Sequence, residues 1–239
     1  MPAPPARDLD WEGCFNVRDL GGLPAAGGRP TRWRSVVRAD SLDHLTAAGW
    51  AAVRAYGVRT VVDLRNGDER VGEGAAERPG VTTVHTPLET TDPDFRAAWG
   101  GPLRATPLFY RPLLEQFPER VAAVVRAVGQ APPGGVVVHC GIGRDRAGLA
   151  TLVLLTLAGV PPHEIVADHA ISTQRLGPLF AREGREDEAA IVERLLAERG
   201  TTVERVLLDT LDGLDVPERL RAGGLTEAEL AAARARLVS

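Results

Sequence analysis

Residues 134–148 read GGVVVHCGIGRDRAG, and this stretch organises the rest of the chain. Residues 134–138 form a nearly continuous β-branched run, which is typical of a strand buried on both faces. The run delivers His139 and Cys140 to its carboxyl end, five residues follow, and Arg146 then opens a long apolar helix. We expect a central strand, a tight turn and a buried helix here.

Short β-rich runs alternate with helical patterns through the first two-thirds of the chain. Strands are predicted over residues 32–39, 58–64 and 81–87, and helices over residues 45–56 and 111–128. Beyond Asp145 the pattern is helical only, with helices over 147–158, 162–174, 186–199 and 203–211, and a flexible connection over 177–187. Thr226, with Glu229 three residues later, is a capping-box start for the last helix.

This order predicts an α/β fold with a mostly parallel central sheet flanked by helices and an additional C-terminal helical layer. No repeat or low-complexity linker divides the chain. We therefore expect a single domain over residues 1–239, with a core at about residues 13–175 and a helical extension over residues 176–239.

The composition excludes several classes of function. All 28 basic residues are arginine, against 32 acidic ones, and the net charge of −4 argues against a nucleic-acid binder that relies on bulk positive charge. Cys14 and Cys140 alone argue against a disulfide framework or a cysteine zinc site, and we expect no metal and no cofactor. No signal peptide or membrane span is visible, so we expect a cytoplasmic protein without stable membrane insertion. Leaderless secretion and the oligomeric state stay open.

The segment around Cys140 has the residue types that phosphate chemistry requires. A thiol that attacks phosphorus must be a thiolate, and a helix N-terminus with a nearby guanidinium lowers a cysteine pKa from ~8.5 into the range ~3.5–7.5. Glycines at 141 and 143 let the backbone amides of residues 141–146 turn inward as an anion nest. Arg146 can bind two phosphoryl oxygens with its planar fork. Gly141, Ile142, Gly143 and Arg144 are thus predicted to bind the phosphate.

Two other interpretations of this segment have weaker support. A cysteine at the end of a strand is by itself usually a packed core residue, but the two glycines, the arginine and the helix together favour a catalytic loop. A Walker-type phosphate loop is excluded because the chain has no lysine.

The loop HCGIGRDRAG at residues 139–148 resembles the HCxxGKDRTG loop of the atypical bacterial tyrosine phosphatases that also act on phosphoinositides, within the cysteine-dependent protein tyrosine phosphatase superfamily. The motif NVRDLGG at residues 16–22, Arg38, the segment GVRTVVDLR at residues 57–65 and Glu69-Arg70 match the N-terminal framework of that family. Residues 159–168 resemble its next helix. The resemblance covers roughly residues 13–175, with a weaker match at residues 224–226.

The resemblance implies a metal-independent phosphomonoester hydrolase acting on a phosphorylated protein, a phosphoinositide or phosphoserine/threonine. Cys140 would be the nucleophile, Arg146 the phosphate ligand, and His139 a residue that orients the loop. The resemblance favours Asp145 as general acid. Asp92 or Asp94, on an acidic loop after the third strand, is the rival donor, and Asp63 is expected to pair with Arg65 or Arg70.

Two residues depart from the family pattern. Arg144 replaces the loop lysine, so a larger fork stands where relatives have a compact ammonium. Ala147 replaces the hydroxyl residue that, in the superfamily, is taken to hydrogen-bond the cysteine sulfur and help it leave. A phosphate-binding pseudophosphatase therefore stays open, and a rhodanese-like sulfur transferase is a weaker alternative. Clustered arginines at 29, 32, 34 and 38 also suggest a phosphoinositide surface or, equally, a solvated edge strand.

Overall fold

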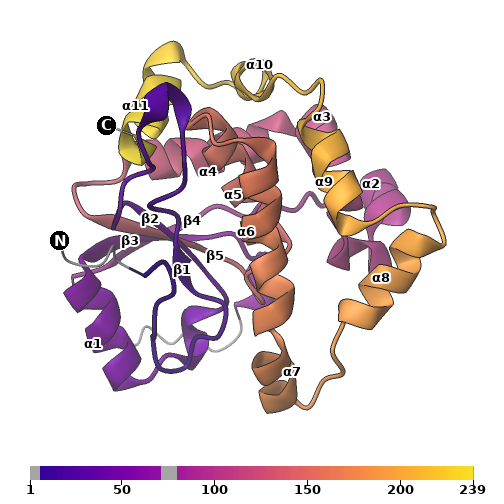
Figure 1. Ribbon diagram of the computed structural model, residues 1–239, viewed down its shortest axis with the longest axis horizontal. Coiled ribbons are helices and arrows are strands. Elements are labelled where there is room, and N and C mark those ends of the chain that lie inside the picture. Colours follow the sequence, from indigo (N-terminus) through magenta and orange to yellow (C-terminus); the bar gives the residue numbers. More distant parts are fainter. Residues whose placement is uncertain (1–5, 71–79, 239) are drawn as a thin grey trace.

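The computed structural model describes residues 6–70 and 80–238, and a five-stranded sheet lies at its centre (Figure 1). The strands are β1 (Arg18–Asp19), β2 (Val36–Ala39), β3 (Val58–Asp63), β4 (Thr82–His85) and β5 (Gly135–His139). Their order is β1-β2-β5-β3-β4, and β1 alone runs antiparallel to its neighbour. This confirms the predicted α/β fold with a mostly parallel sheet.

Strand β5 is the middle of the sheet. It pairs with β2 on one side and with β3 on the other, so Val138 lies opposite both Arg38 and Val62. All five of its residues are buried, as the β-branched run predicted. Because both neighbours are parallel to β5, their carboxyl ends meet where β5 delivers His139, and the loop that follows emerges at this edge.

Helices cover both faces of the sheet. Alternate valines of β2, β3 and β5 point to opposite sides, because side chains alternate along a strand. Val37, Val61 and Val137 pack in a small core with Trp11 and helix α1 (Ala47–Tyr56). The larger core on the other face holds α4 (Pro118–Gln130) and α5 (Arg146–Leu157).

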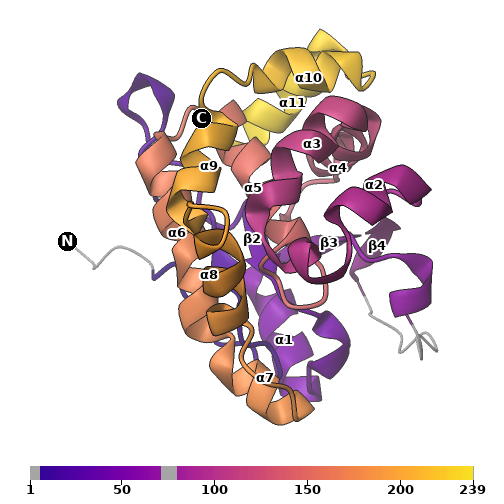
Figure 2. The ribbon, with the colours of Figure 1, turned by 90° about the vertical axis from the view of Figure 1, so that its right-hand side faces the viewer.

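The C-terminal third of the chain forms the predicted helical layer. After α5 come α6 (Pro162–Arg175), α7 (Gly177–Glu183), α8 (Ala189–Ala197), α9 (Val203–Leu211), α10 (Val216–Ala222) and α11 (Glu227–Leu237). Helices α8 and α9 lie on the right-hand side of Figure 1, remote from α1, and face the viewer in Figure 2. The last helix begins with the predicted capping box, in which Thr226 and Glu229 cap each other's backbone amides.

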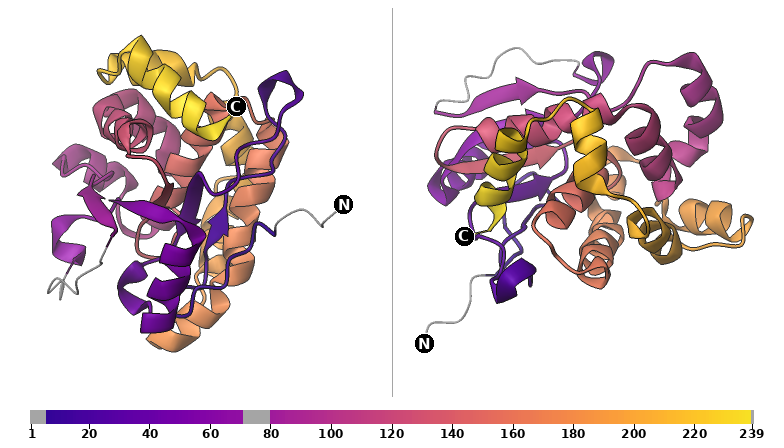
Figure 3. Two further views of the ribbon diagram at one scale, coloured as in Figure 1. Left: turned by 90° about the vertical axis from the view of Figure 1, so that its left-hand side faces the viewer. Right: turned by 90° about the horizontal axis from the view of Figure 1, so that it is seen from above.

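Helix α11 returns to the beginning of the sheet. Its C-terminal end lies beside the segment that precedes β2 (Figure 3), where the amide of Arg32 donates to the carbonyl of Leu237 at 2.8 Å. A backbone hydrogen bond thus joins the end of α11 to the segment before β2.

Three sequence-based predictions need correction. The strand predicted over residues 32–39 begins only at Val36, because Arg34 has a positive φ of 60° in a turn held by the carboxylate of Asp19. The helix predicted over 111–128 is two helices, α3 (Tyr110–Gln116) and α4, because Pro118 starts a new helix and has no amide proton for the first one. The connection predicted over residues 177–187 contains helix α7. Helix α2 (Pro93–Trp99) was not predicted.

Candidate active site

The loop between β5 and α5 forms the floor of a pocket of about 420 Å³. Cys140 is 1% exposed and lies at the point where the central strand ends. Its loop contributes Cys140, Gly141, Ile142, Asp145 and Arg146 to the lining. The described walls are Glu69 and Glu89, residues of η4 (Gly101–Ala105), Arg185 from the connection between α7 and α8, and Glu188 and Ile191 from the start of α8.

The carbonyl groups of the loop are held by donors that come from residues 16–41. The amide of Ser41 donates to the carbonyl of Gly141 at 2.8 Å. The side-chain amide of Asn16 donates to the carbonyl of Ile142 at 3.1 Å, and Arg38 donates to the carbonyl of Gly143 at 2.7 Å. When consecutive carbonyls are engaged by the protein, the amides between them are left to face the pocket, as an anion nest requires.

One of the two loop glycines is sterically required. Gly143 has a φ of +72°, and a Cβ there would lie 2.6 Å from the carbonyl oxygen of Ala39 and the amide of Asp40. Gly141 has no such restriction, because its nearest neighbour to an added Cβ would be an Arg146 nitrogen at 3.7 Å. The tight packing of the loop on the end of β2 therefore depends on Gly143.

The Arg146 guanidinium faces two glutamates. Its terminal nitrogens donate to both oxygens of Glu69 at 2.5 and 2.7 Å, and Nε lies 3.3 Å from Glu89. Burial by itself lowers the pKa of Arg146, but its hydrogen bonds to Glu69 and the nearby carboxylates raise that pKa above the usual arginine value. Glu69 is itself oriented by the amide of Asn66 at 3.1 Å. Arg146 is thus fixed, with Nε at the side of Glu89.

Asp145 and Arg144 lie differently from each other. The side chain of Asp145 lines the pocket and accepts a hydrogen bond from Nε of Arg144 at 2.9 Å. The Arg144 side chain is 4% exposed and is not among the described residues that line the pocket. Its position leaves only the backbone amide of Arg144 to contact a phosphate on the pocket floor.

His139 is buried beneath the loop. Its Nδ1 lies 3.2 Å from the carbonyl oxygen of Cys140, and its Nε2 lies 3.7 Å from Asp63. Burial lowers the pKa of His139 to about 4, despite the opposing charge of Asp63. The predicted pairing of Asp63 with Arg65 is found at 2.9 Å, with Arg70 at 3.4 Å.

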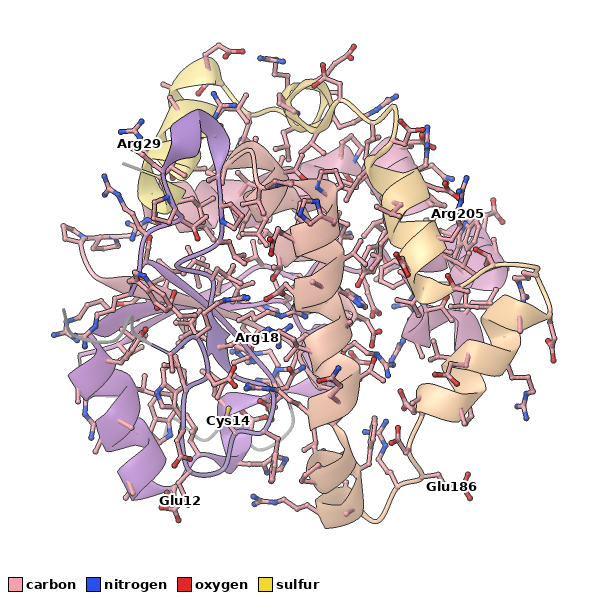
Figure 4. All side chains as sticks on the ribbon, viewed as in Figure 1. Glu12, Cys14, Arg18, Arg29, Glu186 and Arg205 are labelled. Atoms are coloured by element: carbon pink, nitrogen blue, oxygen red, sulfur yellow. The ribbon has the colours of Figure 1, made fainter. Side chains whose placement is uncertain are left out.

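The arginines of the N-terminal motifs meet in a buried cluster below the loop. Asp168 of α6 accepts from Arg18 at 3.0 Å and from Arg38 at 2.7 Å, and it also pairs with Arg7. Burial alone raises the pKa of Asp168, but the adjacent guanidinium groups hold it well below its usual range. Arg18 appears at the centre of the molecule in Figure 4 and is fully buried. Arg38 is likewise buried, so it does not belong to the exposed arginine surface or solvated edge strand that the sequence suggested.

The first turn of α5 is fixed from the opposite side. The hydroxyl of Tyr110 donates to the carbonyl of Asp145 at 2.7 Å and lies 3.1 Å from Nε2 of His169. A Cβ at Gly148 would lie 2.4 Å from that hydroxyl. Glycine at 148 therefore lets Tyr110 reach the backbone where the loop becomes helix.

The acidic loop after β4 reaches the pocket through a residue that we did not predict. Asp92 caps α2 by accepting from the amide of Phe95 at 2.8 Å, and neither it nor Asp94 is among the described residues of the lining. Glu89, which precedes Asp92 and Asp94 on this loop, is the residue whose carboxylate faces Arg146. The sequence showed that the loop is acidic, but it did not show that the loop directs Glu89 into the pocket.

Within residues 6–70 and 80–238, no cluster of three or more His, Cys, Asp or Glu side chains has the arrangement of a metal site. No helix in this described part of the chain is long and apolar enough to span a membrane.

The sequence was compared with known proteins. A protein of Cupriavidus necator, whose name assigns it provisionally to the tyrosine-protein phosphatases, is 31% identical over 177 residues, covering 70% of this chain and 64% of the relative. A tyrosine-protein phosphatase of Nostoc commune is 31% identical over 157 residues, covering 59% of this chain and 49% of the relative. The chain therefore spans only about half to two-thirds of the length of these two relatives.

A third relative, the triple specificity protein phosphatase PtpB of Mycobacterium tuberculosis, is 27% identical over 201 residues, with 71% of each chain covered. Among solved structures, TpbA of P. aeruginosa in complex with phosphotyrosine covers 80% of this chain and 86% of its own, at 17% identity and a TM-score of 0.42. The model of the tyrosine phosphatase family matches residues 9–239, nearly the whole chain. The chain that carries this Cys140 loop therefore belongs to the tyrosine phosphatase family.

Proposed function

We propose that the protein is a protein tyrosine phosphatase that works without a metal and forms a phosphocysteine intermediate. The observation that carries this proposal is the shared position of Cys140 and Arg146 on the floor of one pocket, with the loop carbonyls between them held away from it. Phosphoryl transfer needs mainly positioning and charge stabilisation, which such a cradle supplies.

In the proposed reaction, the Cys140 thiolate attacks phosphorus while the bond from phosphorus to the leaving oxygen breaks. Arg146 and the amides of residues 141–146 bind the three remaining phosphoryl oxygens. Asp145 donates its proton to the leaving oxygen, because its carboxyl group lines the same pocket. In the second step Asp145 takes a proton from water, the water oxygen attacks phosphorus, and the Cys140 thiolate leaves.

The substrate would be a phosphorylated protein. Pro102, Ile142 and Ile191 give the pocket an apolar lining above the phosphate site, which suits an aromatic ring. Activity on phosphoinositides or on phosphoserine and phosphothreonine is a further part of this proposal, and the name of the mycobacterial relative describes three specificities for that protein alone. We infer one cytoplasmic domain, in which residues 176–239 contribute Arg185, Glu188 and Ile191 to the pocket.

A phosphate-binding pseudophosphatase is the second candidate. Ala147 is fully buried immediately after Arg146 and offers no hydroxyl to the departing sulfur. Such a protein would bind phosphate and form the phosphocysteine at most once.

The deciding experiment is hydrolysis of p-nitrophenyl phosphate with EDTA present. Wild type should release phosphate over many turnovers, while Cys140→Ser and Arg146→Ala should each lose at least ~100-fold in kcat/KM. Cys14→Ser is the matched control and should keep the wild-type rate, since Cys14 does not line the pocket. Release of at most one equivalent of p-nitrophenol per enzyme by wild type would favour the pseudophosphatase. Full activity of Cys140→Ser would refute the nucleophile.

A further inference from the structure

The side chain of Arg144 connects three parts of the molecule. Its Nε donates to Asp145 at 2.9 Å, and its terminal nitrogen donates to Glu188 at 2.9 Å and to the carbonyl of Ala105 at 3.2 Å. These partners belong to the catalytic loop, to the start of α8 and to η4. With 4% of its side chain exposed, Arg144 lies behind the pocket floor and links two of its walls.

The buried apolar residues of the α8 wall form a cluster of their own. Val192 and Leu196 pack with Val206 in a small apolar cluster that is separate from the two cores on the sheet. The connection from α7 to α8 is exposed over residues 184–187. Glu188 and Ile191 nevertheless line the pocket that holds Cys140. The Arg144–Glu188 pair is therefore a direct charged link between this wall and the catalytic loop.

The geometry depends on the shape of the guanidinium group. Nε serves Asp145 while a terminal nitrogen serves Glu188 and Ala105. A lysine carries a single nitrogen at the end of its chain, so it would have to serve these acceptors from one point. The hydrogen bonds and charges of Asp145 and Glu188 raise the pKa of Arg144, although burial opposes them, which fits a residue held between two carboxylates.

We propose that Arg144 is a positioning residue that clamps the α8 wall to the catalytic loop and thereby sets the affinity for the part of the substrate beyond the phosphate. The inference rests on the proposed phosphatase function. The phosphate cradle is formed by Arg146 and the amides, so loss of the clamp should weaken binding of a large substrate. Because Nε of Arg144 also donates to Asp145, the proposed general acid, the Glu188 variants isolate this effect from the chemical step.

The first test compares KM for a phosphotyrosyl peptide with KM for p-nitrophenyl phosphate. Glu188→Ala should raise the peptide KM about fivefold relative to the p-nitrophenyl phosphate KM of the same variant, in keeping with a partly exposed charged pair. Glu188→Gln, which keeps an acceptor, should recover part of the loss. Glu186→Ala is the matched control, because Glu186 is exposed on the same connection and projects away from the molecule (Figure 4).

A double-mutant cycle tests whether the two residues act together. Arg144→Lys should also raise the peptide KM, and adding Glu188→Ala to it should cost little more. Independent, multiplying effects of the two substitutions on the peptide KM would overturn the clamp. An equal rise in KM for the phosphotyrosyl peptide and for p-nitrophenyl phosphate would also overturn the clamp.

A measurement without substrate separates this inference from the proposed function. Amide hydrogen exchange in α8 should be faster in Arg144→Lys and Glu188→Ala than in wild type, with exchange in α5 unchanged. If the amides of α8 exchanged in both variants at the wild-type rate, the clamp would be refuted even if the enzyme were active. Failure of wild type to turn over p-nitrophenyl phosphate would refute the function, and faster exchange would still support the clamp.

Discussion

Arg38 donates to the carbonyl of Gly143 at 2.7 Å, and its other terminal nitrogen pairs with Asp168 at 2.7 Å. One guanidinium therefore ties the Cys140 loop to the buried charge cluster on α6. Both the donor and the cluster are shielded from water, and hydrogen bonds that involve charged groups contribute about 1.5–3 kcal/mol in proteins. Arg38 thus helps to hold the shape of the proposed phosphate cradle.

Removal of Arg38 should damage activity more than folding of the sheet. Arg38→Ala leaves the carbonyl of Gly143 without its donor, so we expect kcat/KM for p-nitrophenyl phosphate to fall about 30-fold, as about 2 kcal/mol of loop stabilisation is lost. The kcat/KM of Arg38→Lys should lie between the values of wild type and Arg38→Ala. A lysine ammonium keeps the positive charge, but it does not reproduce the two separate hydrogen bonds of the guanidinium to Gly143 and Asp168. Arg59→Ala is the control, since Arg59 donates to the carbonyl of Val58 and is not among the described residues that line the pocket. Wild-type activity of Arg38→Ala would contradict this prediction.

Asp145 should matter most for substrates with a basic leaving oxygen. Asp145→Asn should lower kcat about 10²-fold or more for phenyl phosphate, and much less for p-nitrophenyl phosphate, because general acid catalysis contributes about 10²–10⁴-fold when the leaving group needs a proton. Asp92→Asn is the companion variant, because asparagine also caps helices well and should leave α2 intact. A leaving-group dependence in Asp92→Asn, with none in Asp145→Asn, would give the acid role to Asp92.

Glu89 should compete with phosphate for Arg146. Glu69 occupies both terminal nitrogens, and Glu89 lies 3.3 Å from Nε, where a bidentate phosphate would also need a donor. Glu89→Gln removes the negative charge and should lower the inhibition constant of inorganic phosphate about three- to tenfold, in line with about 1 kcal/mol for a nearby charge.

Glu69→Gln is the contrasting variant for that measurement. It should lower kcat, because Glu69 holds the orientation of Arg146 through two hydrogen bonds. Steady-state kinetics with p-nitrophenyl phosphate gives the kcat of Glu69→Gln, and competitive inhibition by phosphate gives the inhibition constant of Glu89→Gln. Weaker phosphate binding in Glu89→Gln would show that Glu89 supports the cradle instead of competing for it.

Ala147 should limit breakdown of the phosphocysteine. Ala147→Ser places a hydroxyl in the family position at the start of α5 and should raise the steady-state rate while reducing the pre-steady-state burst of p-nitrophenol. Ala147→Gly, which adds no hydroxyl, is the control. Unchanged burst and rate in Ala147→Ser would show that another step limits turnover.

Two buried histidines should make the protein less stable in mild acid. Burial lowers the pKa of His139 to about 4 and that of His169 to about 3, whereas both titrate near 6.5 in the unfolded chain. Between pH 6.5 and about 4 the unfolded state therefore binds more protons, and the free energy of unfolding falls as pH falls, by up to about 1.4 kcal/mol per pH unit for each histidine. Above pH 6.5 neither contributes a slope.

Urea denaturation at pH 7, 6 and 5 measures this slope. His169→Phe should remove about half of it, whatever its effect on stability at pH 7. His163→Phe, on the same helix but exposed, should leave the slope unchanged. A His169→Phe slope equal to that of wild type would assign the acid sensitivity to other groups.

The sequence predicted the centre of the fold well because local signals there agree. The β-branched run, the Cys140 loop and the apolar helix each indicate one structure, and the sheet confirms them. The predicted strand over residues 32–39 was too long, because the turn at Arg34 is imposed by the distant carboxylate of Asp19. Local propensity carries no information about such a contact.

The site was predictable in its floor but not in its walls. Cys140, Asp145 and Arg146 follow one another in sequence, so a motif can place them together. Glu89 and Glu188 reach the pocket from elements 51 residues before and 48 residues after Cys140, and tertiary packing alone brings them there. Arg144 is predicted to bind the phosphate, and the sequence did not show that its guanidinium donates to Asp145 and Glu188, which leaves its backbone amide for that role.

The donors that hold the loop carbonyls also give the site a place in the order of folding. Asn16 and Ile142 are 126 residues apart in sequence, and Arg38 and Gly143 are 105 apart. Val36 and Val136, which pair across β2 and β5, are separated by a comparable length of chain. The Cys140 loop therefore closes in the same long-range step that joins β2 to β5, and the chain entropy of that closure is lost once for both. Completion of the sheet and assembly of the proposed phosphate cradle are then one event in folding, so a substitution that slows one should slow the other.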